Sequence, residues 1–205
     1  MRQTAENLQG RARKDPTIFW TRQVTEVAEE LEKTGVYRVK REYIEAKNDT
    51  IADYYLKLYR WFTREAGRYI QIPAGCEYPI WMSVDEASML RPTEGTVTLK
   101  VEIPASEYLL CNYDAWGYCV NYWYVPLDDA DKEAHEAELR RYGLSSDDQL
   151  FLTDKGNFYP LLKRKVQDSW KRVFTLPPAD ASAGLVATAW ELRREWVKEV
   201  MPYEG

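Results

Sequence analysis

Glu191 is the residue of this sequence whose type and setting best suit catalysis. It comes near the end of residues 185–192, a run of small, β-branched and aromatic residues typical of a buried strand. A carboxylate buried there without a partner would be costly, so chemistry is one reason for its presence. The alternative is that Glu191 faces solvent at the strand end or pairs with Arg193 or Arg194. Local spacing does not separate the two interpretations.

Other polar side chains lie among the aromatic rings of residues 108–127. The chain has 8 Trp and 15 Tyr, and such rings build hydrophobic cores as well as pockets that stack on ligands. A polar group held among them needs a hydrogen-bond partner, which is either internal or a ligand. The candidates for ligand contact are Asp114, Trp116 and Asn121.

The histidine and the cysteines suit neither a metal site nor a reactive centre. His135, the only histidine, lies in a helical pattern over residues 131–142 with acidic neighbours, and we expect a solvated, non-catalytic side chain. Cys76, Cys111 and Cys119 show no CxxC spacing, and the chain has no HExxH motif, so no zinc site is predicted. The cysteines are predicted to be reduced thiols of a cytoplasmic protein.

One basic surface stands out in an acidic chain. The net charge is −5, which gives no general attraction to nucleic acid or to an anionic membrane, and no apolar run is long enough to span a membrane. Residues 159–174 are predicted to form a helix whose cations either contact phosphate or are simply solvated. These cations are Lys163, Arg164, Lys165, Lys171 and Arg172.

The patterns around these residues predict an α+β fold: a single domain with a split, mostly antiparallel sheet and surrounding helices. A strand over 17–23 ends in polar residues, and a helix over 24–34 stops at Gly35. Apolar residues at helical spacing predict a helix over 51–66 after a cap at 48–50. Residues 1–16 form a basic arm, and 17–205 form the domain. Further strands are expected at 70–72, 78–84 and 96–103, with an irregular segment at 85–94.

Several segments together resemble a bacterial family known as domain of unknown function 3841. The resemblance covers residues 18–203, nearly the whole chain except the arm, and implies no activity. Arg22 departs from the family pattern, which has an aliphatic residue there. The segments are Phe19-Trp20-Thr21-Arg22-Gln23, Tyr78-Pro79-Ile80-Trp81, Tyr113-Asp114-Ala115-Trp116 and Ala187-Thr188-Ala189-Trp190-Glu191-Leu192.

The order of the predicted elements also resembles the architecture of the ADP-ribosyltransferase superfamily. That resemblance implies NAD as a substrate, no metal, and Glu191 as the catalytic carboxylate that stabilises the positive charge developing on ribose. Two features depart from the superfamily: there is no Ser-Thr-Ser triplet, and Ala189 stands where a second carboxylate would activate an arginine acceptor. The NAD contacts that the resemblance implies are Thr21, Arg22 and Gln23 at ribose or phosphate, Tyr78 or Trp81 on nicotinamide, and Ser83 as a hydroxyl contact.

Three functions follow as hypotheses. The first is a cytoplasmic ADP-ribosyltransferase-like enzyme, a bacterial toxin or phage-defence effector that modifies nucleic acid or protein and has an antitoxin partner. The alternative is a non-catalytic domain of the same fold that binds a nucleotide or a protein. An RNA-cleaving enzyme is less favoured because the chain has a single histidine to move protons. An enzyme of the first kind needs Glu191 in a cleft facing Gln23.

Overall fold

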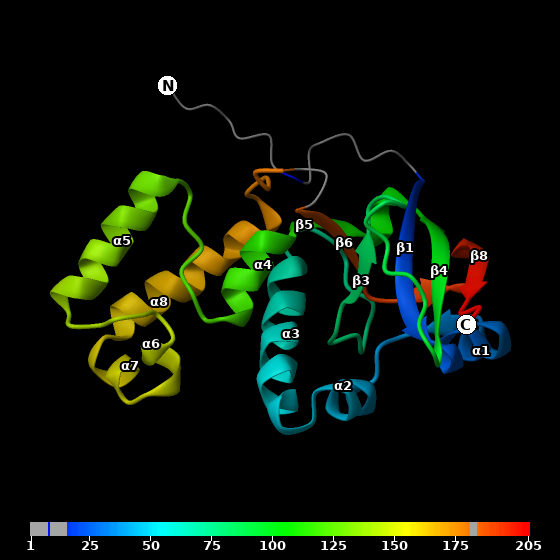
Figure 1. Cartoon of the computed structure of the whole chain (residues 1–205), viewed down its shortest axis with the longest axis horizontal. Coiled ribbons are helices and arrows are strands. Elements are labelled where there is room, and N and C mark those ends of the chain that lie inside the picture. Colours follow the sequence, from blue (N-terminus) through cyan, green and yellow to red (C-terminus); the bar gives the residue numbers. More distant parts are fainter. Residues whose placement is uncertain (1–7, 9–15, 181–183) are drawn as a thin grey trace.

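A computed structural model gives the structure of residue 8, residues 16–180 and residues 184–205, so the predicted basic arm lies almost wholly outside the described residues (Figure 1). A six-stranded sheet has the order β5-β6-β3-β1-β4-β8, and β2 and β7 form a separate pair. Every pairing is antiparallel, which confirms the predicted α+β fold with a mostly antiparallel sheet in one domain. The strands are β1 (Thr17–Val24), β2 (Val36–Tyr37), β3 (Ile80–Ser83), β4 (Thr96–Ile103), β5 (Leu109–Asn112), β6 (Leu185–Ala189), β7 (Leu192–Arg193) and β8 (Val197–Pro202).

The helices fall into two groups around this sheet. In Figure 1, α1 lies beside β4 and β8, whereas α3 stands next to β3 and α5 to α8 form the opposite end of the molecule. The α-helices are α1 (Thr25–Thr34), α2 (Arg41–Asn48), α3 (Ala52–Ala66), α4 (Tyr113–Val120), α5 (Asp129–Arg141), α6 (Gln149–Leu152), α7 (Lys155–Phe158) and α8 (Pro160–Ser169). The short 3₁₀ helices are η1 (Asp49–Ile51), η2 (Ala105–Glu107), η3 (Trp170–Phe174) and η4 (Arg194–Trp196).

Several elements with strong local sequence patterns were predicted correctly. The strand predicted over 96–103 is β4, whose alternating apolar side chains are buried. The strand and helix predicted before Gly35 are β1 and α1, and Gly35 adopts a φ of +81° that glycine tolerates best. The helix predicted over 51–66 is α3.

Other expectations were wrong where tertiary contacts override local sequence. Residues 70–72 form no strand, because Ile70 packs into the core from a turn that follows α3. No side chain caps α3, which instead follows the 3₁₀ turn η1. The helix predicted over 159–174 stops as an α-helix at Ser169 and continues as η3. The strand predicted over 185–192 ends at Ala189.

Two hydrophobic clusters lie on the two faces of the shared strands. The first joins α3, α4 and α8 to β5 and includes Phe62, Trp116 and Trp190. The second joins α1 to β1, β3 and β4 and includes Phe19 and Leu99. Trp81 of β3 packs against the first cluster, whereas the residues on either side of it in β3 belong to the second. One sheet therefore contributes side chains to both cores.

Candidate functional site

The end of β6 positions Glu191. The indole Nε1 of Trp190 donates a hydrogen bond of 2.8 Å to Oγ1 of Thr63 on α3, which fixes this residue in the first hydrophobic cluster. The chain bends at Trp190 between β6 and β7. Glu191 is only 5% exposed, so of the alternatives that the sequence left open, a solvent-facing carboxylate is excluded.

Two arginines hold the carboxylate of Glu191. Oε2 accepts hydrogen bonds from Nη2 and Nε of Arg38, at 2.8 and 3.1 Å. Oε1 accepts one from Nε of Arg193 at 2.8 Å, and Nη2 of the same guanidinium lies at 2.8 Å. Pairing with Arg193, part of the non-catalytic alternative that the sequence left open, is therefore present, whereas Arg194 pairs with Glu32 and the second partner is Arg38.

The guanidinium groups decide the charge of Glu191. Burial alone would raise the pKa of its carboxyl, but the hydrogen bonds and charges of Arg38 and Arg193 outweigh that effect and hold the pKa below its ordinary value. The same bonds raise the pKa of both arginines. Glu191 is consequently an ionised carboxylate at neutral pH, and its charge is neutralised from two sides.

A surface hollow of about 660 Å³ lies beside this group, and Arg38 forms part of its wall. Nearby, burial raises the pKa of the Cys76 thiol despite the opposing charge of Arg38, so Cys76 is not a thiolate nucleophile at neutral pH. The volume is in the range of small-ligand sites, and the wall mixes cations with carboxylates. The lining residues are Glu30, Thr34, Val36, Arg38, Val39, Lys40, Arg41, Glu42, Gly75, Glu77 and Tyr78.

Sheet register brings some predicted NAD contacts to the same end of the sheet as Glu191. Ile80 of β3 lies opposite Ala189 of β6, so Tyr78 and Glu191, each two residues further along, extend beyond the same end. Gln23 near the end of β1 belongs to that end too, because β1 and β3 pair at Trp20 and Ser83.

The side chains at this end are nevertheless bonded internally. Gln23 donates from Nε2 to Oγ1 of Thr21 at 2.7 Å, and Thr21 donates to the carbonyl of Trp81 at 2.9 Å. Tyr78 accepts a hydrogen bond of 3.1 Å from Arg60. Among the described residues, no hydrogen bond joins Gln23 to Glu191.

The remaining predicted NAD contacts lie on the other face of the sheet. Trp81 packs against the rings of Phe62 and Trp116, with both pairs of ring centres 5.1 Å apart. Arg22 is exposed and donates to the carbonyl of Arg91 at 3.3 Å, and the hydroxyl of Ser83 donates to the carbonyl of Ser88 at 3.0 Å. The sheet thus separates these side chains from Thr21 and Gln23, because alternate residues of a strand point to opposite faces.

Two of the three candidates near α4, Trp116 and Asn121, have partners within the protein. Trp116 is 7% exposed and stacks on Tyr59, with ring centres 5.9 Å apart. Asn121 donates to the carbonyl of Gly117 at 2.8 Å and ends the helix. Asp114 is exposed in the first turn of α4. Internal bonding, one of the two expected alternatives, holds for Asn121.

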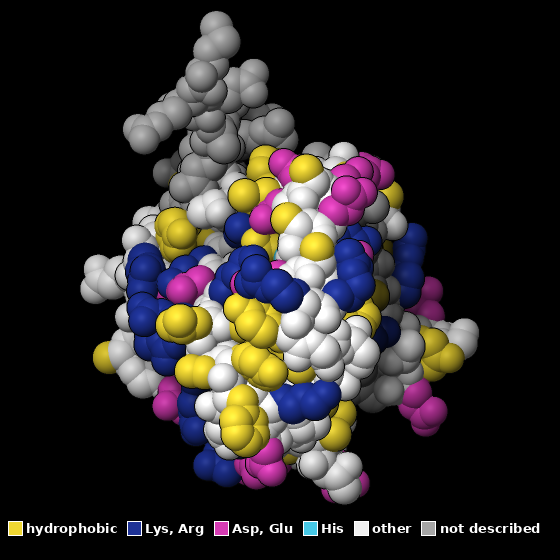
Figure 2. Space-filling model, turned by 90° about the vertical axis from the view of Figure 1, so that its left-hand side faces the viewer, with side chains coloured by type: hydrophobic (Ala, Val, Ile, Leu, Met, Phe, Trp, Pro, Cys, Tyr) yellow, Lys and Arg dark blue, Asp and Glu magenta, His cyan; other side chains and the backbone are white. Residues whose placement is uncertain are grey.

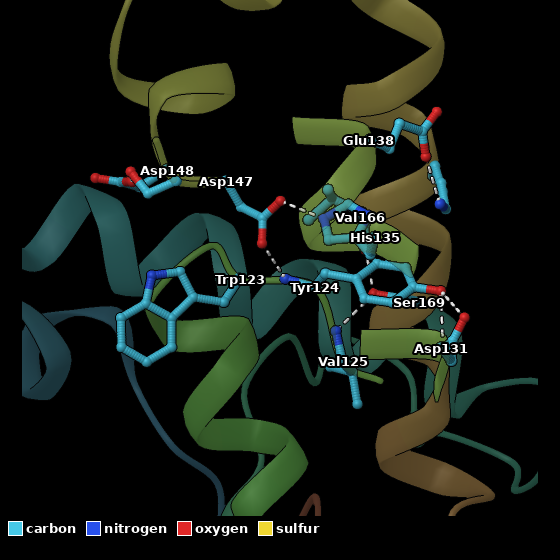
Figure 3. Close-up of polar contacts among 12 residues, drawn as sticks. Trp123, Tyr124, Val125, Asp131, His135, Glu138, Asp147, Asp148, Val166 and Ser169 are labelled. Atoms are coloured by element: carbon cyan, nitrogen blue, oxygen red, sulfur yellow. Dashed lines mark hydrogen bonds and ion pairs between the residues drawn. The ribbon is translucent and has the colours of Figure 1, made fainter. Parts of the chain in front are cut away.

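The prediction that His135 is a solvated side chain was wrong. The side chain is 3% exposed, and Nε2 lies 2.6 Å from Oδ1 of Asp147, whose Oδ2 accepts the backbone N–H of Tyr124 at 2.8 Å (Figure 3). The imidazole also stacks on the ring of Tyr124 with centres 4.0 Å apart. The missed signal is the spacing to Leu139, four residues later on the same buried helix face.

Most of the cations predicted to form the basic surface of residues 159–174 are in ion pairs. A second hollow, of about 430 Å³, has Arg164, Lys165 and Arg172 in its wall. Their carboxylate partners are Asp168 at 3.7 Å, Glu138 at 2.6 Å and Asp131 at 2.9 Å, respectively. These pairs lower the attraction of this hollow for phosphate.

Residue 8, residues 16–180 and residues 184–205 contain neither a group of metal ligands nor a membrane-spanning helix. Within them, no three His, Cys, Asp or Glu side chains gather as metal ligands would. The described helices include none with both the length and the apolar character needed to cross a bilayer.

Comparison with known proteins places the chain in one family. The model of domain of unknown function DUF3841 matches residues 18–198, and the chain belongs to that family. No curated protein and no solved structure matches the chain.

Proposed function

We propose that this DUF3841 member is an ADP-ribosyltransferase-like enzyme that takes NAD as its donor substrate and uses Glu191 as its catalytic carboxylate. The observation that carries the proposal is an ionised, buried Glu191 bonded to Arg38 in the wall of a hollow of about 660 Å³. A fixed negative charge of this kind stabilises a ribose that becomes positive as nicotinamide departs.

The order of elements supports the same proposal. Strand β1 carries Thr21-Arg22-Gln23 just before its last residue, α1 is followed by Gly35, and Glu191 follows β6 before the short helix η4 and the final strand β8. These are the features through which the sequence resembles the ADP-ribosyltransferase superfamily. This support is architectural, and the chemistry rests on Glu191 and its surroundings.

In the proposed reaction, the bond between ribose C1′ and the nicotinamide nitrogen breaks, and nicotinamide leaves with the electron pair. The acceptor forms a new bond to C1′ and loses its proton to solvent. Arg38 is the mobile partner, because its side chain is 49% exposed, and it turns from Glu191 to the pyrophosphate of NAD. Arg193 then keeps Glu191 ionised and in place.

The acceptor is a nucleic acid or a protein in a bacterial cytoplasm, and a toxin or phage-defence role with an antitoxin partner is part of this proposal. Ala189 provides no second carboxylate to activate an arginine side chain. The chemistry at Glu191 is therefore aimed at an acceptor that is already nucleophilic.

The test is incubation of the purified chain with NAD labelled in its adenosine part, together with cell extract separated afterwards into protein, RNA and DNA. We expect labelling by the native chain, loss of labelling in Glu191→Gln, and full labelling in the control Glu195→Gln, an exposed glutamate nearby. Circular dichroism establishes that each variant is folded. Absence of labelling and of nicotinamide release by the folded native chain would sink the proposal.

A specific observation favours a second candidate, a non-catalytic binding domain. Both oxygens of Glu191 already bind arginines, and the predicted NAD contacts are divided between two faces of the sheet. In that case, calorimetry detects a ligand in the hollow beside Arg38, but NAD stays intact. Binding that is weakened by Arg38→Ala, with no turnover by the native chain, would identify this second function.

A further inference from the structure

We propose that a surface at the α6–α8 end of the molecule binds an acidic, amphipathic segment of a partner protein. The surface consists of Leu152, Lys155, Phe158, Leu161 and Lys163, and it is called the tip surface below. It belongs to the end of the molecule opposite α1 and β8 in Figure 1 and does not rest on the function proposed for Glu191.

Three short helices hold the tip surface together. Gly156 of α7 lies so close to α6 that an added Cβ would come within 2.0 Å of the carbonyl oxygen of Leu150. The same Cβ would lie 3.3 Å from Cδ of Lys163 on α8. This close packing joins the ends of α6 and α7 to the start of α8, which carry Leu152, Phe158 and Leu161.

The apolar part of the tip surface is unusually exposed. Leu161, Phe158 and Leu152 are 81%, 76% and 66% exposed, and they are the three most exposed large hydrophobic side chains among the described residues. Exposed apolar side chains are common singly, but a group on packed neighbouring elements is typical of an interaction site.

Two lysines, Lys155 and Lys163, belong to the tip surface beside its apolar side chains. Nζ of Lys155 donates to Oε1 of Gln149 at 3.0 Å, and Nζ of Lys163 lies 5.1 Å from the ring centre of Phe151. Neither lysine has an ion pair within the described part of the chain. Residues 140–172 hold eight Lys and Arg against four Asp and Glu. Most of these cations form ion pairs, so the positive charge of the tip surface is that of its two lysines.

Figure 2 looks at this end of the molecule and shows hydrophobic side chains interleaved with Lys and Arg, with acidic side chains gathered in the upper part and others scattered towards the left, right and lower edges. A partner that covers the apolar side chains must therefore carry carboxylates beside its own apolar residues. An acidic amphipathic helix has that pattern, with apolar residues on one stripe and Glu or Asp on its flanks.

The same features disfavour a nucleic acid as the occupant. Nucleic acids are bound chiefly through phosphates by free cations and through bases by aromatic rings. Two of the three exposed apolar residues are leucines, and neighbouring Arg164, Lys165 and Arg172 are already paired with carboxylates. Apolar contacts therefore give specificity here, and the two lysines select the charge of the partner.

The test uses fluorescence anisotropy with a labelled synthetic peptide of about 18 residues, roughly five helical turns, that carries Leu and Phe on one face and Glu on both flanks. We expect binding to the full chain and at least about tenfold weaker binding to Phe158→Ser/Leu161→Ser and to Lys155→Glu/Lys163→Glu. Matched controls are Ile51→Ser and Lys57→Glu, which change exposed residues near and within α3.

Each alternative has its own result. A scrambled peptide of equal composition that binds as tightly as the amphipathic peptide overturns the proposal, as does binding that the tip substitutions leave unchanged. No binding of the amphipathic peptide overturns it too, and single-stranded RNA bound through Lys155 and Lys163 would then identify a nucleic-acid surface. Self-association that Phe158→Ser/Leu161→Ser abolishes would assign the tip surface to a second copy of the chain.

Discussion

Two buried glutamates of this protein are held in different ways. Glu65 is 5% exposed and lies within 3.5 Å of two arginines, yet its Oε2 accepts no hydrogen bond among the described residues. Glu191 is equally buried, but each of its oxygens accepts a well-placed hydrogen bond from a guanidinium group. The position and ionisation of Glu191 are therefore fixed by its partners, which is what a carboxylate acting on a charged transition state requires.

This arrangement predicts a pH-dependent stability. Glu191→Gln is expected to lower the free energy of unfolding by about 1–3 kcal/mol at neutral pH, because the amide leaves two guanidinium groups without their counter-charge. The pKa of Glu191 is lowered in the folded chain, so its contribution is complete above the ordinary value of 4.5 and is lost as pH falls through the lowered pKa. Urea unfolding of both proteins over a series of acidic pH values measures this difference.

The control for that experiment is Glu195→Gln, which changes an exposed glutamate and is expected to alter stability little at any pH. The free-energy difference between the native chain and Glu191→Gln must shrink towards acid. A difference that stays constant, or one that grows as pH falls, contradicts the assigned ionisation of Glu191.

The short helices α6 and α7 depend on a close backbone approach. Gly156→Ala would place a methyl group 2.0 Å from the backbone oxygen of Leu150, so the two helices must separate. We expect a loss of about 1–3 kcal/mol in stability, since overpacking forces the backbone to shift. Hydrogen exchange is the measurement. In Gly156→Ala, exchange of the α6 and α7 amides should be accelerated relative to the native chain, and more so than exchange of the α3 amides.

Gly117→Ala is the matched control, because a Cβ at Gly117 in α4 meets nothing within 4 Å. This change should leave exchange in α6 and α7 unaltered and raise stability by about 0.5–1 kcal/mol, the usual gain of alanine over glycine inside a helix. Unchanged exchange in Gly156→Ala would show that the α6–α7 contact is looser than described.

The local sequence predicted helices and strands correctly where one hydrophobic periodicity ran along the whole element and a residue that ends such elements followed. Strand β4 alternates along its length, and α1 ends at a glycine, so both were found with nearly correct bounds. Residues 185–192 have uniform strand propensity, but Trp190 turns towards Thr63 on α3 and ends β6. That partner lies 127 residues away in sequence, and no local pattern contains it.

The candidate site was predictable in part for the same reason. The apolar run around Glu191 singled out this carboxylate but left its burial open, and Arg38 pairs with it across 153 residues. The resemblance to the ADP-ribosyltransferase superfamily grouped Thr21, Gln23, Trp81 and Ser83 as NAD contacts, whereas strand register places them on opposite faces of the sheet. His135 was misjudged because its neighbours in sequence are acidic, while its neighbours in space are Tyr124 and Asp147.

The molecule as a whole is built from two hydrophobic cores that share one sheet. Strand β3 contributes Trp81 to the core beneath α3 and contributes Ile80 and Met82 to the core beneath α1. Strand β6 divides its side chains in the same way, with Val186 on the first side and Ala187 on the second. Loss of either core removes support from strands that the other core needs, so the two should not unfold separately.

This coupling predicts a single cooperative unfolding transition. Substitutions in either hydrophobic core should lower its melting temperature. Phe62→Ala in the first core should cost about 3–5 kcal/mol and Leu99→Ala in the second about 2–5 kcal/mol. In a chain of this size each kcal/mol lowers the melting temperature by about 2–4 °C. Lys57→Ala, at an exposed position of α3, is the control and should shift the transition little. Near-ultraviolet and far-ultraviolet circular dichroism should give coincident melting curves for every variant, whereas a second transition moved by only one core substitution would mean that the cores fold as separate units.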